Sequence, residues 1–322
     1  MASFDKINYL LRPSKQVERK LLIEALQKLS RGGYFIQDYT YLGLGSIYYA
    51  DFILFHKYLS INNMICVEKE DIPKRMGFNK PYEFITLKMS PVSDIIPTLN
   101  RESPYFIWLD YDSALDRNKL DDIRSCIRIM SPGSVFLVTL AADPVQLNDL
   151  LSYEDTKDID ESQKQLKKCG ILSDLIGAHL GRQVNVGDIT RRKLPLTYAT
   201  AVRNYINTCL DTRPETRFYQ LFNFVYADNM QMMSFGGIID NDNSSAKIDK
   251  SGVYELDFIT LDAKPIVISA PPLTIREKSW LEKHMVMNPN PPLELEFEIE
   301  KDFIDVFLKY YRHYPVYYET LV

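Results

Sequence analysis

Cysteine is scarce in this 322-residue chain, which contains only four of them. They are far apart and form no Cys-x-x-Cys pair: Cys66, Cys126, Cys169 and Cys209. Such spacing provides neither the disulfide framework of a small secreted protein nor the paired thiolates of a zinc site. We therefore expect buried thiols at Cys66 and Cys126, which fall in apolar segments, and a cytoplasmic protein.

Long apolar runs are also missing. No segment approaches the roughly 20 apolar residues that cross a membrane. The first residues, MASFDKINYLL, lack the apolar core of a secretory signal peptide. We expect no membrane as a partner.

A positive overall charge is absent as well, since the formal net charge is −5 at pH 7. This excludes a global field that would attract nucleic acid. Local basic segments remain at 12–20 (RPSKQVERK) and 190–193 (TRRK), but charge runs of this kind are usually solvated faces. Nucleic acid is therefore an open but not a favoured partner.

The sequence does contain a regular alternation of helical and strand patterns. Residues 14–31 have apolar side chains at helical spacing, and strand-like and helix-like segments then alternate as far as residue 143. We expect strands at 35–42, 63–70, 83–88, 105–112 and 134–140, and helices at 46–59 and 116–130. Several strands are almost continuously apolar, which is typical of a parallel sheet covered on both faces. The alternation predicts an α/β fold with a doubly wound, Rossmann-like sheet.

The pattern divides the chain into five segments. We expect an N-terminal helical segment (1–34), a Rossmann-like core (35–143), a helical insertion (144–213), a terminal β-hairpin of the core sheet (214–240) and a C-terminal extension (241–322). The hairpin strands are expected at 217–228 and 230–239. In the extension we expect a strand at 254–261 and helices at 274–286 and 300–312.

The stretch YLGLGSIYYADF (41–52) places two glycines one residue apart, between a strand and a helix. Such a turn lets the backbone approach a nucleotide-like ligand closely. The third glycine of the dinucleotide motif G-x-G-x-x-G is missing, because Tyr48 stands in its place. This disfavours a pyrophosphate-bearing cofactor such as NAD, and a nucleoside without phosphates tolerates the change better. Glu68, 23 residues after Gly45, stands where an acidic side chain accepts hydrogen bonds from ribose hydroxyls.

Gly43, Gly45 and Glu68, in a βαβαβ frame that ends in a hairpin, resemble the class I S-adenosylmethionine-dependent methyltransferases. The resemblance covers roughly residues 35–143 and 217–239. It implies S-adenosylmethionine as the cofactor and methyl transfer to an oxygen or nitrogen acceptor, with oxygen favoured. The cofactor-binding residues that it implies are Gly43, Gly45, Ser46, Glu68 and Ser90. The acceptor, a small molecule or a macromolecule, and the oligomeric state are not indicated.

Asp110 and Asp112, in FIWLDYDSAL, stand at the carboxyl end of the fourth predicted strand, where open α/β sheets bind ligands. In the methyltransferase family this position often faces the methyl group and the acceptor, so the resemblance implies catalytic roles for both. Asp110 and Asp143 also match two magnesium ligands of the catechol-type O-methyltransferases, which implies a Mg²⁺ site. That pattern is incomplete here, because Ser113 and Pro144 replace the family's lysine and asparagine.

A second function class remains open on the residues alone. The same fold could hold a nucleoside without catalysis and act as a scaffold or sensor through its added helical parts. A melting-temperature shift with S-adenosylmethionine separates a protein that binds this cofactor from one that holds no ligand.

Overall fold

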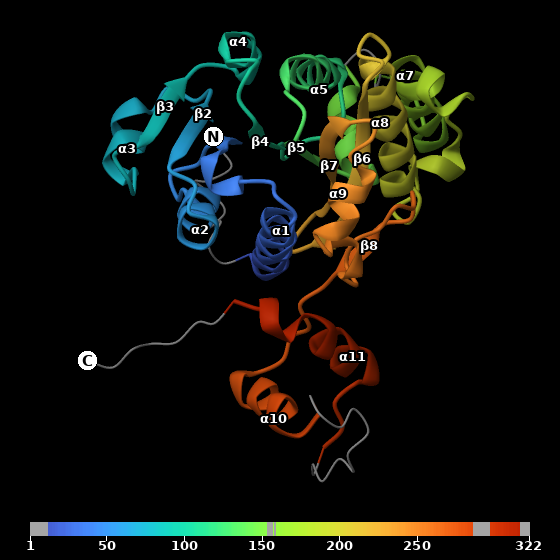
Figure 1. Ribbon diagram of the computed structural model, residues 1–322. Helices are drawn as coiled ribbons and strands as arrows, with labels where there is room; N and C mark the ends of the chain where they lie inside the picture. Colours follow the sequence, from blue (N-terminus) through green and yellow to red (C-terminus); the bar gives the residue numbers. More distant parts are fainter. Residues whose placement is uncertain (1–11, 153–156, 158, 286–296, 316–322) are drawn as a thin grey trace.

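The computed structural model describes residues 12–152, 157, 159–285 and 297–315. At its centre is a sheet with the strand order β3-β2-β1-β4-β5-β7-β6-β8 (Figure 1). The strands are β1 (Thr40–Leu44), β2 (Asn63–Glu68), β3 (Ile85–Met89), β4 (Tyr105–Asp110), β5 (Ser134–Ala141), β6 (Thr216–Ala227), β7 (Gln231–Asn241) and β8 (Ile266–Ile268).

The strand directions are those of a doubly wound sheet that ends in a hairpin. β1 pairs in parallel with both β2 and β4, β3 extends the sheet beyond β2, and β5 extends it beyond β4. β7 then pairs antiparallel with both β5 and β6. The predicted α/β fold with a terminal hairpin is therefore confirmed.

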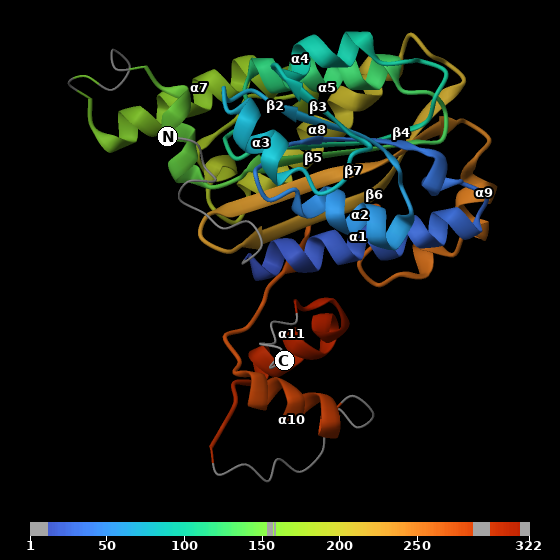
Figure 2. The ribbon, with the colours of Figure 1, turned by 90° about the vertical axis from the view of Figure 1, so that its left-hand side faces the viewer.

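Helices cover both faces of this sheet (Figure 2). One face carries α1 (Pro13–Arg31) and α2 (Ala50–Leu59), and the other carries α4 (Val92–Ile95), α5 (Arg117–Ile129), α7 (Glu161–Leu180) and α8 (Leu194–Leu210). The remaining helices are α3 (Pro73–Asn79), α9 (Ser245–Lys250), α10 (Ile275–Met285) and α11 (Lys301–Tyr310). Short 3-10 turns are η3 (Ile36–Asp38), η4 (Ile96–Thr98), η5 (Pro144–Leu150), η6 (Val186–Ile189), η7 (Val253–Glu255) and η8 (Tyr311–His313).

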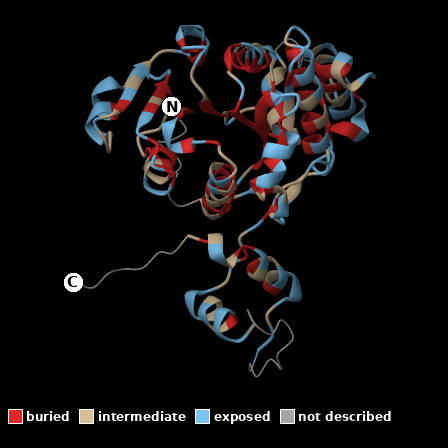
Figure 3. Ribbon diagram, viewed as in Figure 1, coloured by how far each residue is buried: buried red, intermediate tan, exposed pale blue. Residues whose placement is uncertain are grey.

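The core consists of two apolar layers, one on each side of the sheet. The first lies under α1 and α2, and the second under α5 and α8. β5 is buried along its whole length, and Figure 3 shows buried residues at the centre of the sheet. This burial explains why the central strands are apolar runs without alternation.

The segment between the core and the hairpin is helical, as expected, and forms α7 and α8. The two helices predicted in the C-terminal extension correspond to α10 and α11, which lie beyond α1 on one side of the sheet (Figures 1 and 2). The predicted end of the first of these, residue 286, and residues 1–11 of the N-terminal segment lie outside the described residues. None of the helices in the described ranges is long and apolar enough to cross a membrane.

Three sequence predictions of element position were wrong. The first strand begins at Thr40, because the residues before it form the turn η3. The helix expected from residue 46 begins at Ala50, so the glycine turn is followed by a longer loop. Residues 254–261 form no strand, because the 3-10 turn η7 extends to Glu255 and Phe258 packs into the core from the irregular segment after it, and β8 forms later at Ile266–Ile268.

Candidate active site at the carboxyl edge of the sheet

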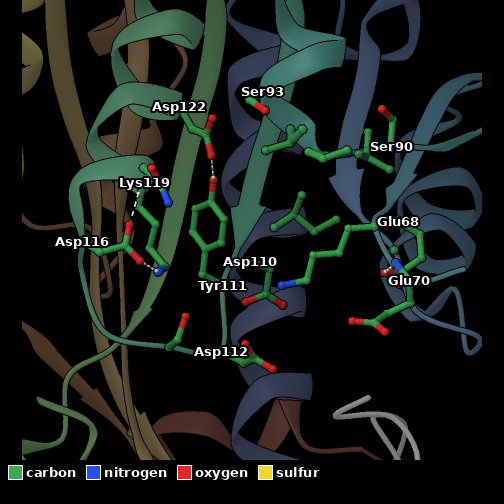
Figure 4. Close-up of a pocket in the computed structure, with 18 of the residues that line it drawn as sticks. Glu68, Glu70, Ser90, Ser93, Asp110, Tyr111, Asp112, Asp116, Lys119 and Asp122 are labelled. Carbon is green, nitrogen blue, oxygen red and sulfur yellow. Dashed lines mark hydrogen bonds and ion pairs between the residues drawn. The ribbon is translucent and has the colours of Figure 1, made fainter. Parts of the chain in front are cut away.

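A pocket of about 860 Å³ lies at the carboxyl ends of β1 to β4 and beside the first turns of α5 (Figure 4). The strand order brings these ends together, because β1 lies between β2 and β4. This is the edge at which open α/β sheets bind their ligands. The lining residues at and just after the strand ends are Leu44, Gly45, Ser46, Val67, Glu68, Lys69, Glu70, Ser90, Pro91, Asp110, Tyr111, Asp112 and Ser113, those from the start of α4 are Val92 and Ser93, and those from α5 and its start are Asp116, Asn118, Lys119, Asp121 and Asp122.

Gly45 lines this pocket and is also tightly packed from behind. Its amide donates a hydrogen bond to the carbonyl of Val67, at 2.6 Å, which joins the turn to β2. A side-chain carbon on Gly45 would lie 2.5 Å from Cys66 Sγ and 3.2 Å from Met76 Cε. The need for glycine here therefore comes at least partly from the protein interior.

Gly43 lies outside the pocket lining. A side-chain carbon on it would lie 2.3 Å from the hydroxyl oxygen of Tyr41, whose buried ring packs against Phe52 and Phe55 of α2. Gly43 thus makes room for an aromatic cluster, and a contact between Gly43 and a cofactor stays a prediction.

The loop that follows Gly45 contains a left-handed residue just before α2. Tyr49 has φ of +46°, a conformation that is strained for a bulky side chain. Its buried hydroxyl donates to the carbonyl of Met76 in α3, at 2.9 Å. This contact links the loop to α3. The chain therefore has, where the third glycine of the motif would stand, a longer loop that a hydrogen bond to α3 holds in place.

Glu68 ends β2 and lines the pocket while being only 8% exposed. Its Oε1 accepts a hydrogen bond from the Glu70 amide, at 3.0 Å. Burial raises the pKa of the Glu68 carboxyl, and the backbone amides of Glu70 and Lys69 oppose this effect without cancelling it. The side chain is therefore a partly desolvated acceptor at the pocket wall, the place that the sequence predicted for a ribose partner.

Ser46 and Ser90 also line the pocket, from the ends of β1 and β3. The Ser46 hydroxyl oxygen accepts from the Tyr48 amide at 3.3 Å, and the Ser90 hydroxyl donates to Asp94 Oδ2 at 3.1 Å. The structure therefore brings four of the five predicted cofactor residues to one pocket, with Gly43 as the exception.

Asp110, at the end of β4, lines the pocket and contacts α1. Its Oδ1 accepts a hydrogen bond from Lys15 Nζ, at 2.7 Å. Burial by itself raises the pKa of the Asp110 carboxyl, but the charge and hydrogen bond of Lys15 outweigh it and leave the pKa below its usual value. A carboxylate held in this way is a weak base.

The expectation that the basic residues of α1 form a solvated face was wrong for two of them. Lys15 and Arg19 are 0% and 2% exposed. Arg19 forms a buried ion pair with Asp51 of α2, as Lys15 does with Asp110. The polar stripe of α1 is buried because carboxylates from neighbouring elements neutralise it, so these two cations are not available to nucleic acid.

Asp112 lines the same pocket and is exposed. None of the residues that the structure describes forms a hydrogen bond or ion pair with its side chain. Of the two acids predicted at this strand end, Asp112 is therefore the one whose carboxylate faces the pocket without a protein cation.

The wall of the pocket that α5 provides was not among the sequence predictions. The Tyr111 hydroxyl donates to Asp122 Oδ2 at 2.7 Å, and Asp116 caps α5 by accepting from the Lys119 amide at 2.9 Å (Figure 4). Burial raises the pKa of Asp122. The sequence did offer a sign of this wall, because the helix predicted from residue 116 follows the β4 end at once and must present its first turns to the same edge.

Asp143 lies outside the pocket lining. It caps η5 by accepting from the Val145 amide at 3.1 Å, and its Oδ2 is 4.0 Å from Arg191 Nη1. Within the described ranges, no three histidine, cysteine or acidic side chains are arranged to hold a metal ion. The partners of Asp110 and Asp143 are thus cationic side chains, and a shared Mg²⁺ remains only a prediction.

Comparisons with known proteins identify the family. Trm1 from Pyrococcus horikoshii, solved with S-adenosyl-L-methionine, is 11% identical and has a TM-score of 0.42, with 73% of this chain and 57% of that chain covered. The O-methyltransferase TomG from Streptomyces achromogenes, also solved with this cofactor, is 13% identical and has a TM-score of 0.34, with 66% and 79% covered. These superpositions are loose, and no curated protein matches the chain. Residues 7–322 match a family model, however, and this chain therefore belongs to the family described as "Putative O-methyltransferase".

Proposed function

We propose that this protein transfers the methyl group of S-adenosylmethionine to an oxygen acceptor in the pocket of Figure 4. One observation carries the proposal: a single pocket joins the glycine turn at Gly45, the carboxylate of Glu68 and the acidic end of β4. The family match supports methyl transfer as the reaction and oxygen as the accepting atom.

The residues present suit this cofactor in size and charge. The pocket volume of about 860 Å³ falls in the usual range for ligand sites and leaves space beyond a nucleoside. The acidic lining residues outnumber the lysines Lys69 and Lys119, and Lys119 is paired with Asp116. An acidic pocket favours a ligand that carries a sulfonium and an ammonium group.

We assign the donor to the side of the pocket formed by β1, β2 and β3. Glu68 would accept hydrogen bonds from the ribose hydroxyls, Gly45 and Ser46 would border the ligand at the turn, and Ser90 would border it beyond β3. Asp110 would then lie near the methyl group. The ends of β1, β2, β3 and β4 all border this one pocket, which supports the arrangement.

Methyl transfer requires the protein mainly to position the donor and the acceptor. Methyl transfer is an in-line displacement at the carbon attached to sulfur, so the alignment of donor and acceptor supplies much of the rate. The acceptor hydroxyl must lose its proton to a base. We assign this role to Asp112, because the carboxylate of Asp110 is held by Lys15.

The test has two measurements on the purified protein. Calorimetry with S-adenosylmethionine should show binding, and transfer of a labelled methyl group to components of a cell extract should show turnover. Binding without transfer to any component would favour the nucleoside-binding alternative. Absence of binding would overturn the proposal.

Cytoplasmic location belongs to the same proposal. The four cysteines are free thiols and are buried, as a protein of a reducing compartment would have them. Immunolocalisation or cell fractionation would test it. Participation of Mg²⁺, through Asp110 and Asp143, is a separate prediction with its own experiment in the Discussion.

A further inference from the structure

Lys15 is a charged side chain without any exposed surface, and it reaches the end of β4 from α1. Its ammonium lies 2.7 Å from Asp110 Oδ1 and 2.9 Å from Glu18 Oε2. It also donates to the Tyr226 hydroxyl at 3.0 Å and lies 4.2 Å from the centre of the Trp108 ring. The cation is therefore held from four directions, while the carboxylate that it holds lines the pocket.

The register of α1 is fixed by contacts that bring Lys15 to this point. Asp228, in the turn between β6 and β7, accepts hydrogen bonds from the backbone amides of Ser14 at 2.9 Å and Lys15 at 3.3 Å. One turn further along the helix, Arg19 pairs with Asp51. A helix anchored at both places cannot slide, so Lys15 cannot leave Asp110 without breaking other contacts.

A buried ion pair such as Lys15 and Asp110 is a costly way to stabilise the fold. Removing two charges from water costs several kcal/mol per ion, and apolar residues of similar volume often stabilise a core as well or better. Here one member of the pair keeps part of its surface, since the Asp110 side chain is 18% exposed where it borders the pocket. The pair therefore presents a fixed anion to whatever the pocket binds.

We propose that Lys15 is a positioning residue of this site, which holds the Asp110 carboxylate as an oriented anion toward the sulfonium of the methyl donor. This inference rests on the proposed function. It gives Asp110 an electrostatic role in place of proton transfer, and it makes the N-terminal helix a part of the active site.

The charge state of Asp110 depends on groups from three elements besides its own strand. α1 contributes Lys15, Arg19 and Glu18, with Arg12 directly before its first residue, while β6 contributes Tyr226 and β1 contributes Tyr41. The cations outweigh the effect of burial and keep the pKa of Asp110 below its usual value. Lys15 has the largest of these lowering effects, so its removal should raise the pKa of Asp110 above that in the wild type.

The experiment compares the affinities for S-adenosylmethionine and S-adenosylhomocysteine, which differ in the positive charge on sulfur. Titration calorimetry measures the ratio of the two affinities at several pH values from about pH 5 to about pH 8. Lys15→Met should reduce the preference for the charged donor by about tenfold at the acidic end, the size of a neighbouring-charge effect. Lys15→Arg, which keeps the positive charge, should preserve most of the preference.

Arg19→Met is the matched control. It removes an equally buried cation from the next turn of the same helix, but Asp51 does not line the pocket. The control should lose thermal stability as Lys15→Met does, while its ratio of affinities changes less than in Lys15→Met, because Arg19 acts on Asp110 more weakly than Lys15 does. An equal change of the ratio in both variants would mean that α1 acts only through stability, and would overturn the inference.

Two further variants cover the case in which Lys15→Met does not fold. In Lys15→Met with Glu18→Gln, one of the two carboxylates near the lost cation is also removed. In Asp110→Asn, Lys15 stays paired with Glu18, and the preference for the charged donor should fall as in Lys15→Met. A wild-type ratio in Asp110→Asn would overturn the inference alone, whereas failure of the wild-type protein to bind either ligand would overturn the proposed function with it.

Discussion

The ammonium of Lys15 lies 2.7 Å from Oδ1 of Asp110, although 95 positions separate the two residues in the chain. This contact joins the first helix to the end of the fourth strand, beneath the pocket. It also changes the chemistry expected of Asp110, because a carboxylate with a bound cation keeps its negative charge and attracts a proton weakly.

The stability of the protein should depend on pH through Asp110. The pKa of this group is lowered in the folded protein relative to its ordinary value of 3.8. It therefore contributes stability above pH 3.8 that is lost as the pH falls through the lower, folded pKa. The stability difference between wild type and Asp110→Asn should be largest near neutral pH and shrink below pH 3.8. Urea denaturation at several pH values measures it, with Asp112→Asn as the unpaired control, and a difference that grows on acidification would contradict the assignment.

Replacement of Glu68 by glutamine should weaken binding of S-adenosylmethionine. The ribose hydroxyls would keep a neutral amide acceptor in place of a charged one, a difference of about 1 kcal/mol, which corresponds to about a fivefold loss of affinity. Calorimetry on wild type and variant is the measurement. Glu83→Gln is a suitable control, since the Glu83 side chain is 99% exposed and lies outside the pocket lining. Equal affinities of wild type and Glu68→Gln would remove Glu68 from the site.

Replacement of Gly45 by alanine should destabilise the fold through Cys66. The added carbon would lie 2.5 Å from Cys66 Sγ, and overpacking of this kind costs about 1–3 kcal/mol. Thermal unfolding without ligand should show a lower Tm for Gly45→Ala. The double variant Gly45→Ala with Cys66→Ala removes the sulfur and should recover part of the loss relative to Cys66→Ala alone. If the double variant recovers nothing, the strain lies elsewhere, for example at the Val67 carbonyl, which is 3.3 Å from the added carbon.

Asp112→Asn should separate binding from turnover. If Asp112 takes the proton of the acceptor, the variant should bind S-adenosylmethionine within a few-fold of wild type and lose labelled methyl transfer by about 100-fold, the scale of general-base catalysis. Asp121→Asn, at another acidic position of the pocket lining, serves as the comparison. Full transfer activity in Asp112→Asn would show that another group accepts the proton.

Chelation tests the magnesium site predicted from Asp110 and Asp143. Their carboxylates are directed to Lys15 and to the neighbourhood of Arg191. Because side-chain cations already balance the charge of both carboxylates, we expect labelled methyl transfer to survive treatment with EDTA. We also expect Asp143→Asn to keep its activity. Loss of transfer in EDTA and its return with Mg²⁺ alone would restore the catechol-type assignment.

The sequence by itself determined the fold class and the edge of the sheet that carries the pocket. Apolar periodicity reflects which faces of a segment are buried, so the residue pattern alone placed β2, β4, β5 and α5 close to their actual bounds. The strand ends, together with the resemblance to the methyltransferases, then predicted Gly45, Ser46, Glu68, Ser90, Asp110 and Asp112, and all six line one pocket, whereas Gly43, predicted with them, does not. The fold and the common edge needed only local pattern and the rule that parallel strands end together, while the roles of these residues came from the resemblance.

Only the tertiary structure decided the partners of the charged residues. Helical spacing cannot tell a solvated lysine from a buried one, because the difference lies in carboxylates supplied by distant elements, as Asp110 is for Lys15 and Asp51 for Arg19. The same limit applies to Gly43 and Gly45, whose neighbours Tyr41 and Cys66 became visible only through packing. Local sequence specifies which segments bury a face, whereas the pairing of buried charges depends on which segments meet, and that is settled when the helices and the sheet pack together.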